Sequence, residues 1–129
     1  MDNCIFCRIA KHDIPAEIVF EDKNYVAFLD IRPSMDGQTL VIPKKHFEKY
    51  VFDMKDAEYV ALLKAARKVV KKIDKALKPR RTCLVIEGFD VPHVHVKLYP
   101  VQEGYLKLFP TFGPSAADLK RTADKIRGV

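Results

Sequence analysis

Two histidines and a lysine at alternate positions are the residues whose types and spacing most clearly indicate chemistry. They lie within Val91–Tyr99, where His93, His95 and Lys97 alternate with apolar residues. Alternation with a period of two is typical of a β-strand, so we expect the three polar side chains to project from one face. The two imidazoles would then lie about 7 Å apart along the strand.

An H-x-H pair on a strand has three interpretations. The histidines are partly exposed residues without a chemical role, or they are two ligands of one metal ion. In the third interpretation one histidine is a nucleophile or an acid–base group and the other does different work. The stretch alone does not distinguish these interpretations, so the rest of the chain has to decide.

A second group of reactive side chains lies near the start of the sequence. Cys4 and Cys7 form a C-x-x-C motif, and Cys83 is the third cysteine. An odd number of cysteines with this spacing argues against a disulfide framework and favours metal binding or thiol exchange. Thiol-exchange motifs normally follow a strand, and the three residues before Cys4 are too few for one. The motif therefore predicts a metal site, with His46 as a candidate third ligand.

Periodicity predicts the strands that position these residues. Short strands are expected at Ile18–Glu21 and Tyr25–Leu29, joined by a hairpin turn, and at Gly37–Pro43. Another strand is expected at Arg81–Ile86. It would form an antiparallel hairpin with the H-x-H strand through the short turn at Glu87–Asp90.

Helical signals occur in three places. A short helix or turn is expected around the C-x-x-C motif, and Ser115 is expected to cap a last helix that ends at Gly128. A long helix is expected after Asp53, its predicted N-cap, with one apolar side facing the core. The residues of that apolar side are Val60, Leu63, Ala66, Val70, Ile73 and Leu77.

Composition is that of an ordinary globular chain. With 129 residues, 48% of them hydrophobic and 31% charged, we expect one domain over residues 1–129. No apolar run approaches the roughly 18 residues of a membrane span, and no basic segment followed by an apolar run opens the chain, so a cytoplasmic protein without membrane contact is expected. The net charge of +6 favours anionic partners. Much of that charge lies on the long helix without aromatic residues for stacking bases, so nucleic acid is not expected.

Five sequence blocks between Asn3 and Pro100 together resemble the histidine-triad family of nucleotide hydrolases and transferases. In order, they read C-I-F-C-x-I, I-P-A-x-I-V-F-E-D, A-F-L-D-I-x-P, T-L-V-I-P-K-K-H and V-P-H-V-H-V. The resemblance implies an α+β fold in which an antiparallel sheet of about five strands packs with a long helix, and it implies a homodimer. The shorter helices at the two ends of the chain fit this arrangement.

The resemblance also implies site residues. The implied ligands of a structural zinc ion are Cys4, Cys7, His46 and His93, a closed Cys₂His₂ set without an open position for water. His95 is implied as the nucleophile: its neutral ring attacks the α-phosphorus and forms a nucleotidyl-histidine intermediate, while a backbone carbonyl holds its other nitrogen. The implied nucleoside-binding residues are Phe6, Ile9, Ile14, Phe28 and Ile31, with Asp30 on the ribose hydroxyls.

The chain departs from the family pattern at three points. Lys97 replaces the third histidine, and an ammonium group holds phosphate oxygens as a fixed cation but is a poor proton shuttle near pH 7. The segment Glu87–Asp90 is shorter than the family's usual loop and lacks its glutamine and asparagine, and its Asp90 would repel an anion. Gln38 stands where many members have a further histidine.

Three functions therefore stay open. The first is a hydrolase or nucleotidyltransferase acting on a nucleoside phosphoramidate, a dinucleoside polyphosphate or a related substrate, with His95 and Lys97 as catalytic residues. The second is a nucleotide-binding regulatory module with little or no turnover. The third is a catalytic metal centre with both His93 and His95 as ligands.

Overall fold

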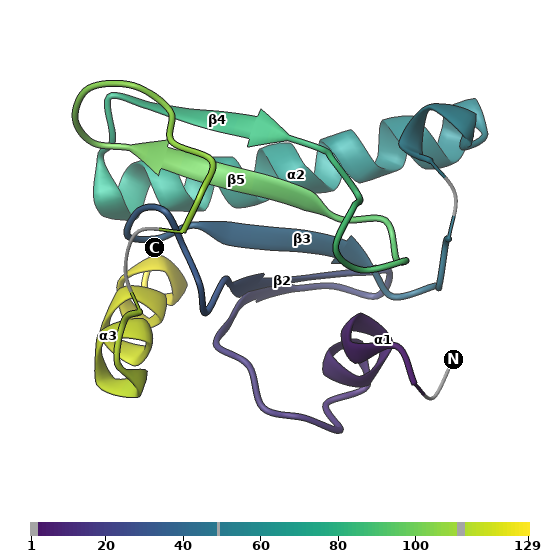
Figure 1. The fold of residues 1–129 in the computed structure, drawn as a ribbon, viewed down its shortest axis with the longest axis horizontal. Coiled ribbons are helices and arrows are strands. Elements are labelled where there is room, and N and C mark those ends of the chain that lie inside the picture. The colour runs from purple at the N-terminus through teal and green to yellow at the C-terminus, as the bar shows by residue number, and fades with distance from the viewer. Residues whose placement is uncertain (1–2, 49, 111–112) are drawn as a thin grey trace.

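A five-stranded antiparallel sheet forms the centre of the computed structural model, which describes residues 3–48, 50–110 and 113–129 (Figure 1). The strands are β1 (Ile18–Glu21), β2 (Tyr25–Leu29), β3 (Thr39–Pro43), β4 (Arg81–Val85) and β5 (Val96–Val101), in the spatial order β1-β2-β3-β5-β4. The helices are α1 (Ile5–Ala10), α2 (Asp56–Leu77) and α3 (Ala116–Arg127), with a 3-10 turn, η1, at Val51–Asp53. The predicted α+β fold is therefore confirmed.

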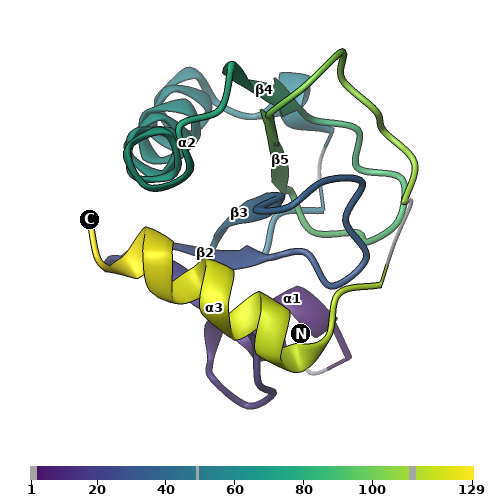
Figure 2. The ribbon, with the colours of Figure 1, turned by 90° about the vertical axis from the view of Figure 1, so that its left-hand side faces the viewer.

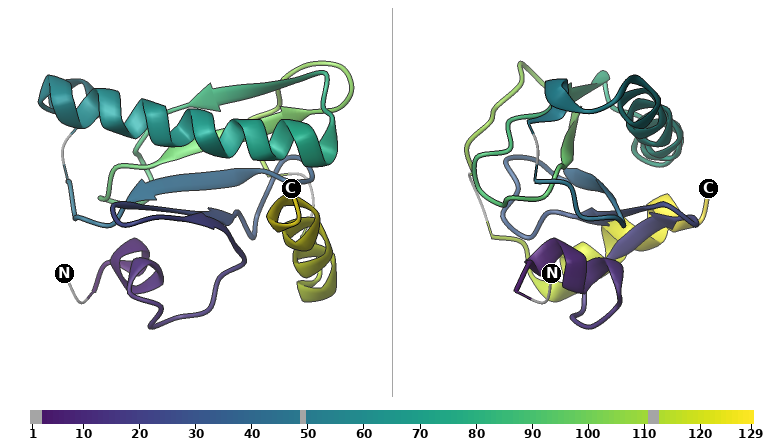
Figure 3. Two further views of the ribbon diagram at one scale, coloured as in Figure 1. Left: turned by 180° about the vertical axis from the view of Figure 1, so that it is seen from behind. Right: turned by 90° about the vertical axis from the view of Figure 1, so that its right-hand side faces the viewer.

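Helices lie on both faces of the sheet. Alternate residues of the central strands point to opposite sides, so each strand contributes side chains to two cores. Ala27 and Val41 join the core beneath α2, whereas Phe28 and Leu40 join a second core beneath α1. Helix α3 packs against α2 and β1 and so extends the layer on the α2 side. Figures 2 and 3 show α1 on the side of the sheet opposite to α2. The α1 side is the one on which the reactive residues meet.

The long helix begins later and faces the sheet differently than its sequence predicts. Asp53 belongs to η1 and is not the N-cap, which is Lys55. Val60 is 45% exposed, and the buried residues are Leu62, Ala65, Ala66, Val69 and Ile73. The sequence contains two overlapping apolar stripes, and the buried stripe carries the alanines, whose small side chains let a helix approach a sheet closely.

The two histidines of the H-x-H motif lie before strand β5 and not within it. Strands β4 and β5 are antiparallel neighbours, as expected, but residues 86–95 form a loop between them. The backbone of this loop bonds elsewhere: the His93 N–H donates to the Val91 carbonyl at 2.8 Å, and the Val94 N–H donates to the Phe47 carbonyl at 2.9 Å. The histidine segment therefore lies beside the chain that follows β3, where His46 is found.

The C-terminal helix begins and ends where the sequence predicts. The Ser115 side chain accepts a hydrogen bond from the Asp118 N–H, the Asp118 side chain accepts one from the Ser115 N–H, and Gly128 is the C-cap. In the described ranges, no helix combines the length and the apolar character that crossing a membrane requires.

The orientation of α2 can be tested with a pair of alanine substitutions. Leu62 is completely buried against the sheet, so Leu62→Ala is expected to lower the free energy of unfolding by about 2–5 kcal/mol. The matched control Val60→Ala, on the exposed side of the same helix, should change it by less than about 0.5 kcal/mol. Urea unfolding measures both, and equal losses would contradict the orientation of the helix.

Candidate functional site

Cys4, Cys7, His46 and His93 meet where α1, the segment after β3 and the segment before β5 come together. One ligand atom from each residue lies within 4.8 Å of all the others. The Nδ1 atom of His46 is 3.1 Å from the Cys7 Sγ and 3.1 Å from the His93 Nδ1. The His93 Nδ1 is 3.4 Å from the Cys7 Sγ and 3.5 Å from the Cys4 Sγ. The structure thus brings together the four predicted metal ligands.

The spacing and the donor types of this cluster fit zinc. A tetrahedral zinc ion with Zn–S bonds of about 2.3 Å and Zn–N bonds of about 2.0–2.1 Å separates its ligand atoms by about 3.3–3.8 Å. The four contacts given above span 3.1–3.5 Å. Two thiols and two imidazoles are a donor set that structural zinc sites commonly use.

Hydrogen bonds outside the cluster set the imidazole tautomers that a metal requires. The Nε2–H of His93 donates to the Pro43 carbonyl at 2.8 Å, and the Nε2–H of His46 donates to the Glu48 carboxylate at 3.1 Å. Each ring therefore presents an unprotonated Nδ1 to the cluster. Burial lowers the pKa of His93, which favours the neutral ring that binds metal.

His95 is held separately from this cluster and in the opposite tautomer. Its Nδ1–H donates to the backbone carbonyl of His93 at 2.8 Å, which leaves a lone pair on Nε2. His95 is 1% exposed, and its ring makes a T-shaped contact with the Phe6 ring at a centroid distance of 5.1 Å. Burial lowers the pKa of His95, so the ring is neutral near pH 7. Of the three interpretations of the H-x-H pair, this geometry favours separate tasks for the two histidines.

His95 and Lys97 line an apolar cavity of about 260 Å³ between α1 and the sheet. All six predicted nucleoside-binding residues line the same cavity: Phe6, Ile9, Ile14, Phe28, Asp30 and Ile31. Leu40 also lines it and was missing from the sequence-based set. Its position follows from strand register, because Leu40 pairs with Phe28 on β2 and with Lys97 on β5.

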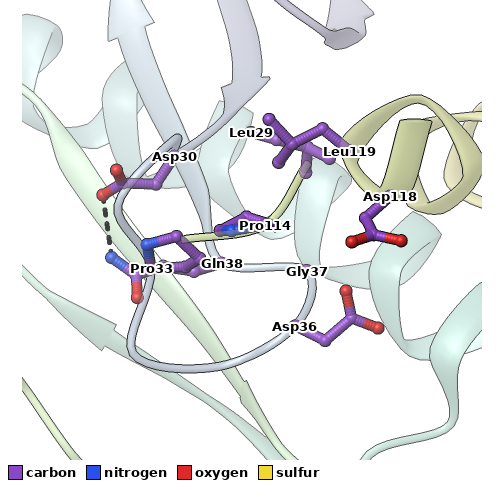
Figure 4. Close-up of a pocket in the computed structure, with 9 residues that line it drawn as sticks. All are labelled: Leu29, Asp30, Pro33, Asp36, Gly37, Gln38, Pro114, Asp118 and Leu119. Atoms are coloured by element: carbon purple, nitrogen blue, oxygen red, sulfur yellow. Dashed lines mark hydrogen bonds between the residues drawn. The ribbon is translucent and has the colours of Figure 1, made fainter. Parts of the chain in front are cut away.

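Asp30 is held at the wall of this cavity by two hydrogen bonds. Its carboxylate accepts from the Arg32 N–H at 2.9 Å. It also accepts from the Gln38 side-chain amide at 2.9 Å (Figure 4). The side-chain oxygen of Gln38, Oε1, in turn accepts from the Ser34 N–H at 2.7 Å. Gln38 therefore orients the carboxylate that faces the cavity. The neighbouring hollow in Figure 4 measures only about 10 Å³, the space of about one water molecule.

Lys97 is paired with two carboxylates of the loop that precedes the histidines. Its Nζ is 2.6 Å from the Glu87 Oε1 and 3.6 Å from the Asp90 Oδ2. Burial alone would lower the pKa of Lys97, but the hydrogen bond and the charge of Glu87 outweigh it and raise the pKa above the ordinary value. The ammonium group therefore stays charged. From the sequence, Asp90 was expected to repel an anion. In the structure its carboxylate lies beside the Lys97 ammonium group.

Comparison with known proteins agrees with the geometry. The HIT domain model matches residues 11–104. A HIT-like protein of Methanocaldococcus jannaschii is 35% identical over 129 residues, which cover 97% of this chain and 99% of that one. Adenosine 5'-monophosphoramidase hnt1 of Schizosaccharomyces pombe is 33% identical over 132 residues, which cover 96% of each chain.

A solved structure extends the likeness to three dimensions. The crystal structure of a Zn-bound histidine triad family protein from Mycobacterium smegmatis superposes with a TM-score of 0.79 at 29% sequence identity. The superposition covers 98% of this chain and 92% of that chain. Sequence and structure together establish that this chain belongs to the HIT family.

Proposed function

We propose that this protein is a zinc-stabilised nucleotide hydrolase or nucleotidyltransferase, with His95 as its nucleophile and a nucleoside phosphoramidate as its favoured substrate. The observation that carries the proposal is the tautomer of His95, because the bond to the His93 carbonyl leaves Nε2 free to attack. The imidazole borders an apolar cavity that also contains an ammonium group and a fixed carboxylate. The fission yeast relative, named an adenosine 5'-monophosphoramidase, supports cleavage of a P–N bond.

The chemistry has two displacements at one phosphorus atom. The Nε2 lone pair of His95 forms a bond to the α-phosphorus, the bond from phosphorus to the leaving group breaks, and the leaving nitrogen takes a proton from solvent. Water then attacks the same phosphorus and gives up a proton as the His95–phosphorus bond breaks. The products are the amine and the nucleoside monophosphate, and one water molecule is consumed. Lys97 balances the charge on the non-bridging phosphate oxygens.

The same cavity is suited to a nucleoside. Its volume of about 260 Å³ is close to the lower end of the range of about 300–1,000 Å³ for ligand pockets. Phe6 and Phe28, whose ring centroids lie 5.6 Å apart, offer apolar surfaces to a base. Each oxygen of the Asp30 carboxylate accepts one hydrogen bond from the protein and keeps a lone pair for a ribose hydroxyl.

Zinc on Cys4, Cys7, His46 and His93 would supply a structural cross-link. The set is closed, so the ion would not offer a position to substrate or water. It would fix α1 against the segment that carries His93, and α1 supplies Phe6 and Ile9 to the cavity. In this proposal zinc maintains the shape of the site, and the His95 Nε2 is the atom that attacks phosphorus.

A nucleotide-binding module without turnover is the second candidate. The observation that favours it is the ion pair between Lys97 and Glu87 at 2.6 Å, because a phosphate has to compete with that carboxylate.

For assembly, we infer a homodimer in the cytoplasm. The observation behind the dimer is that β4 is an edge strand with Leu84 43% exposed, a surface that a second copy would cover.

The nucleophile can be tested directly. His95→Ala is expected to lower kcat/KM for adenosine 5'-phosphoramidate by at least about a thousandfold, because the covalent route is lost. Mass spectrometry of the wild-type protein quenched during turnover should find the nucleotidyl group on His95. His12→Ala is the matched control, since His12 is exposed and outside the cavity. Unchanged turnover in His95→Ala would refute the mechanism, and nucleotide binding without turnover in the wild type would favour the second candidate.

The role of Asp30 predicts a preference for ribose. Asp30→Asn is expected to raise KM for the ribonucleotide substrate by about tenfold, because the amide replaces one acceptor oxygen by a donor. The 2'-deoxy and 3'-deoxy substrates should show the same loss with the wild-type protein and little further loss with Asp30→Asn. Steady-state kinetics measures the six combinations of three substrates and two proteins. Independent, additive losses would show that Asp30 does not contact the sugar.

Metal content and thermal unfolding test the zinc site. Elemental analysis is expected to find one zinc ion per chain in the wild type and in the control Cys83→Ser, and much less in Cys7→Ser. A strong chelator should lower the unfolding temperature of the wild type, because a metal that binds only the folded chain stabilises it. A wild-type protein purified with zinc available but without bound metal, or a chelator without effect, would contradict the proposal.

A further inference from the structure

A second cavity, of about 310 Å³, is lined in part by His95, the residue that also lines the nucleoside cavity. Its wall includes Glu48, Tyr50, Glu87 and Phe89. Among the described residues, His95 is the one that lines both cavities. A phosphorus atom beside the His95 Nε2 carries the nucleoside on one substituent and the leaving group on another. With the nucleoside in the first cavity, the second is the space open to the leaving group.

The two cavities differ in the charged residues that line them, and the first combines Lys97 with the carboxylates of Asp30 and Asp90. Lys97 lines the first, where it can meet phosphate oxygens, and Glu48 and Glu87 line the second. None of the described residues that line the second cavity is a lysine or an arginine. The side chain of Glu87 is 31% exposed and that of Glu48 is 62% exposed, so both carboxylates are accessible to a ligand.

The Lys97–Glu87 ion pair links these two charges. When a phosphate oxygen approaches Lys97, the ammonium group is shared between the phosphate and Glu87. The Glu87 carboxylate then retains more of its negative charge for a cation in the second cavity. Tyr50 and Phe89 are 60% and 89% exposed and offer aromatic faces, which also attract cations.

We propose that the second cavity receives the leaving group and that Glu87, with Glu48, selects a leaving group carrying a positive charge. The favoured substrates are then nucleoside phosphoramidates of amines that carry a second, protonated amino group. Dinucleoside polyphosphates are disfavoured, because their leaving group is itself an anion. This proposal rests on the proposed function and specifies the substrate class of that site.

Three matched substrates test the selection. Each is an adenosine 5'-phosphoramidate with a four-carbon chain on nitrogen, and the chain ends in an ammonium, a methyl or a carboxylate group. The expected order of kcat/KM with the wild-type protein is ammonium, methyl, carboxylate, with a step of about tenfold between neighbours, because one unit charge lies near two partly exposed carboxylates. This series needs no variant, so it does not depend on the folding of one.

Substitution of Glu87 assigns the preference to this cavity. In Glu87→Gln the ratio of kcat/KM for the ammonium and methyl substrates is expected to fall to about threefold or less. A ratio between two substrates on the same protein cancels any general loss of active enzyme. Glu103→Gln is the matched control, since Glu103 is exposed and outside both cavities, and its ratio should equal that of the wild type.

The outcomes separate this inference from the function on which it rests. Equal kcat/KM for the three substrates, or a ratio that Glu87→Gln leaves unchanged, would overturn the selection by Glu87 while turnover through His95 stood. Hydrolysis of diadenosine polyphosphates faster than that of the ammonium substrate would also overturn it. Absence of turnover with every substrate would overturn the proposed function and this inference together.

Discussion

The hydrogen bond from the His95 ring to the backbone carbonyl of His93 connects the two halves of the site. It spans only two residues and measures 2.8 Å, so the position of the His95 imidazole follows directly from that of the His93 backbone. The His93 side chain is fixed in turn, through Nε2 by the Pro43 carbonyl at the end of β3 and through Nδ1 by the cysteine–histidine cluster. These contacts hold both histidines in place within a loop segment, since the strand begins only at Val96.

The same constraint explains how such a short helix can build a cavity wall. Helix α1 has six residues, too few to be stable alone. The Phe6 ring contacts both imidazoles, with centroid distances of 6.0 Å to His93 and 5.1 Å to His95, and Cys4 and Cys7 flank it. Packing and the cysteine–histidine cluster therefore hold the helix where its Phe6 and Ile9 line the first cavity. A change at the cluster would displace Phe6 and the His93 carbonyl together.

How much of this arrangement could be predicted depends on the range of the forces involved. The bounds of β1 and β2 match the sequence prediction because local alternation and a polar turn determine a hairpin. The predicted metal ligands and the predicted nucleoside-binding residues came from the ordered family blocks, and the structure brings each set together. The predicted start of β5 was wrong because the Val94 N–H donates to the Phe47 carbonyl, and no local pattern encodes that hydrogen bond. The support of Asp30 by Gln38 was missed for the same reason, since a loop brings the two together.

The replacement of the third histidine by Lys97 changes the electrostatics of the site more than its shape. A neutral imidazole needs no counter-ion, whereas a partly buried ammonium does, and Glu87 and Asp90 provide two carboxylates for one cation. The loop that lost the family's glutamine and asparagine thus supplies the charges that the lysine requires, so these departures from the pattern compensate one another. The two carboxylates lie at different cavities, since Asp90 lines the same cavity as Lys97 and Glu87 lines the second. A lysine held in its charged form is a poor proton shuttle, so in the proposed function Lys97 acts through its charge, and the proposed selection of leaving groups by Glu87 is likewise electrostatic.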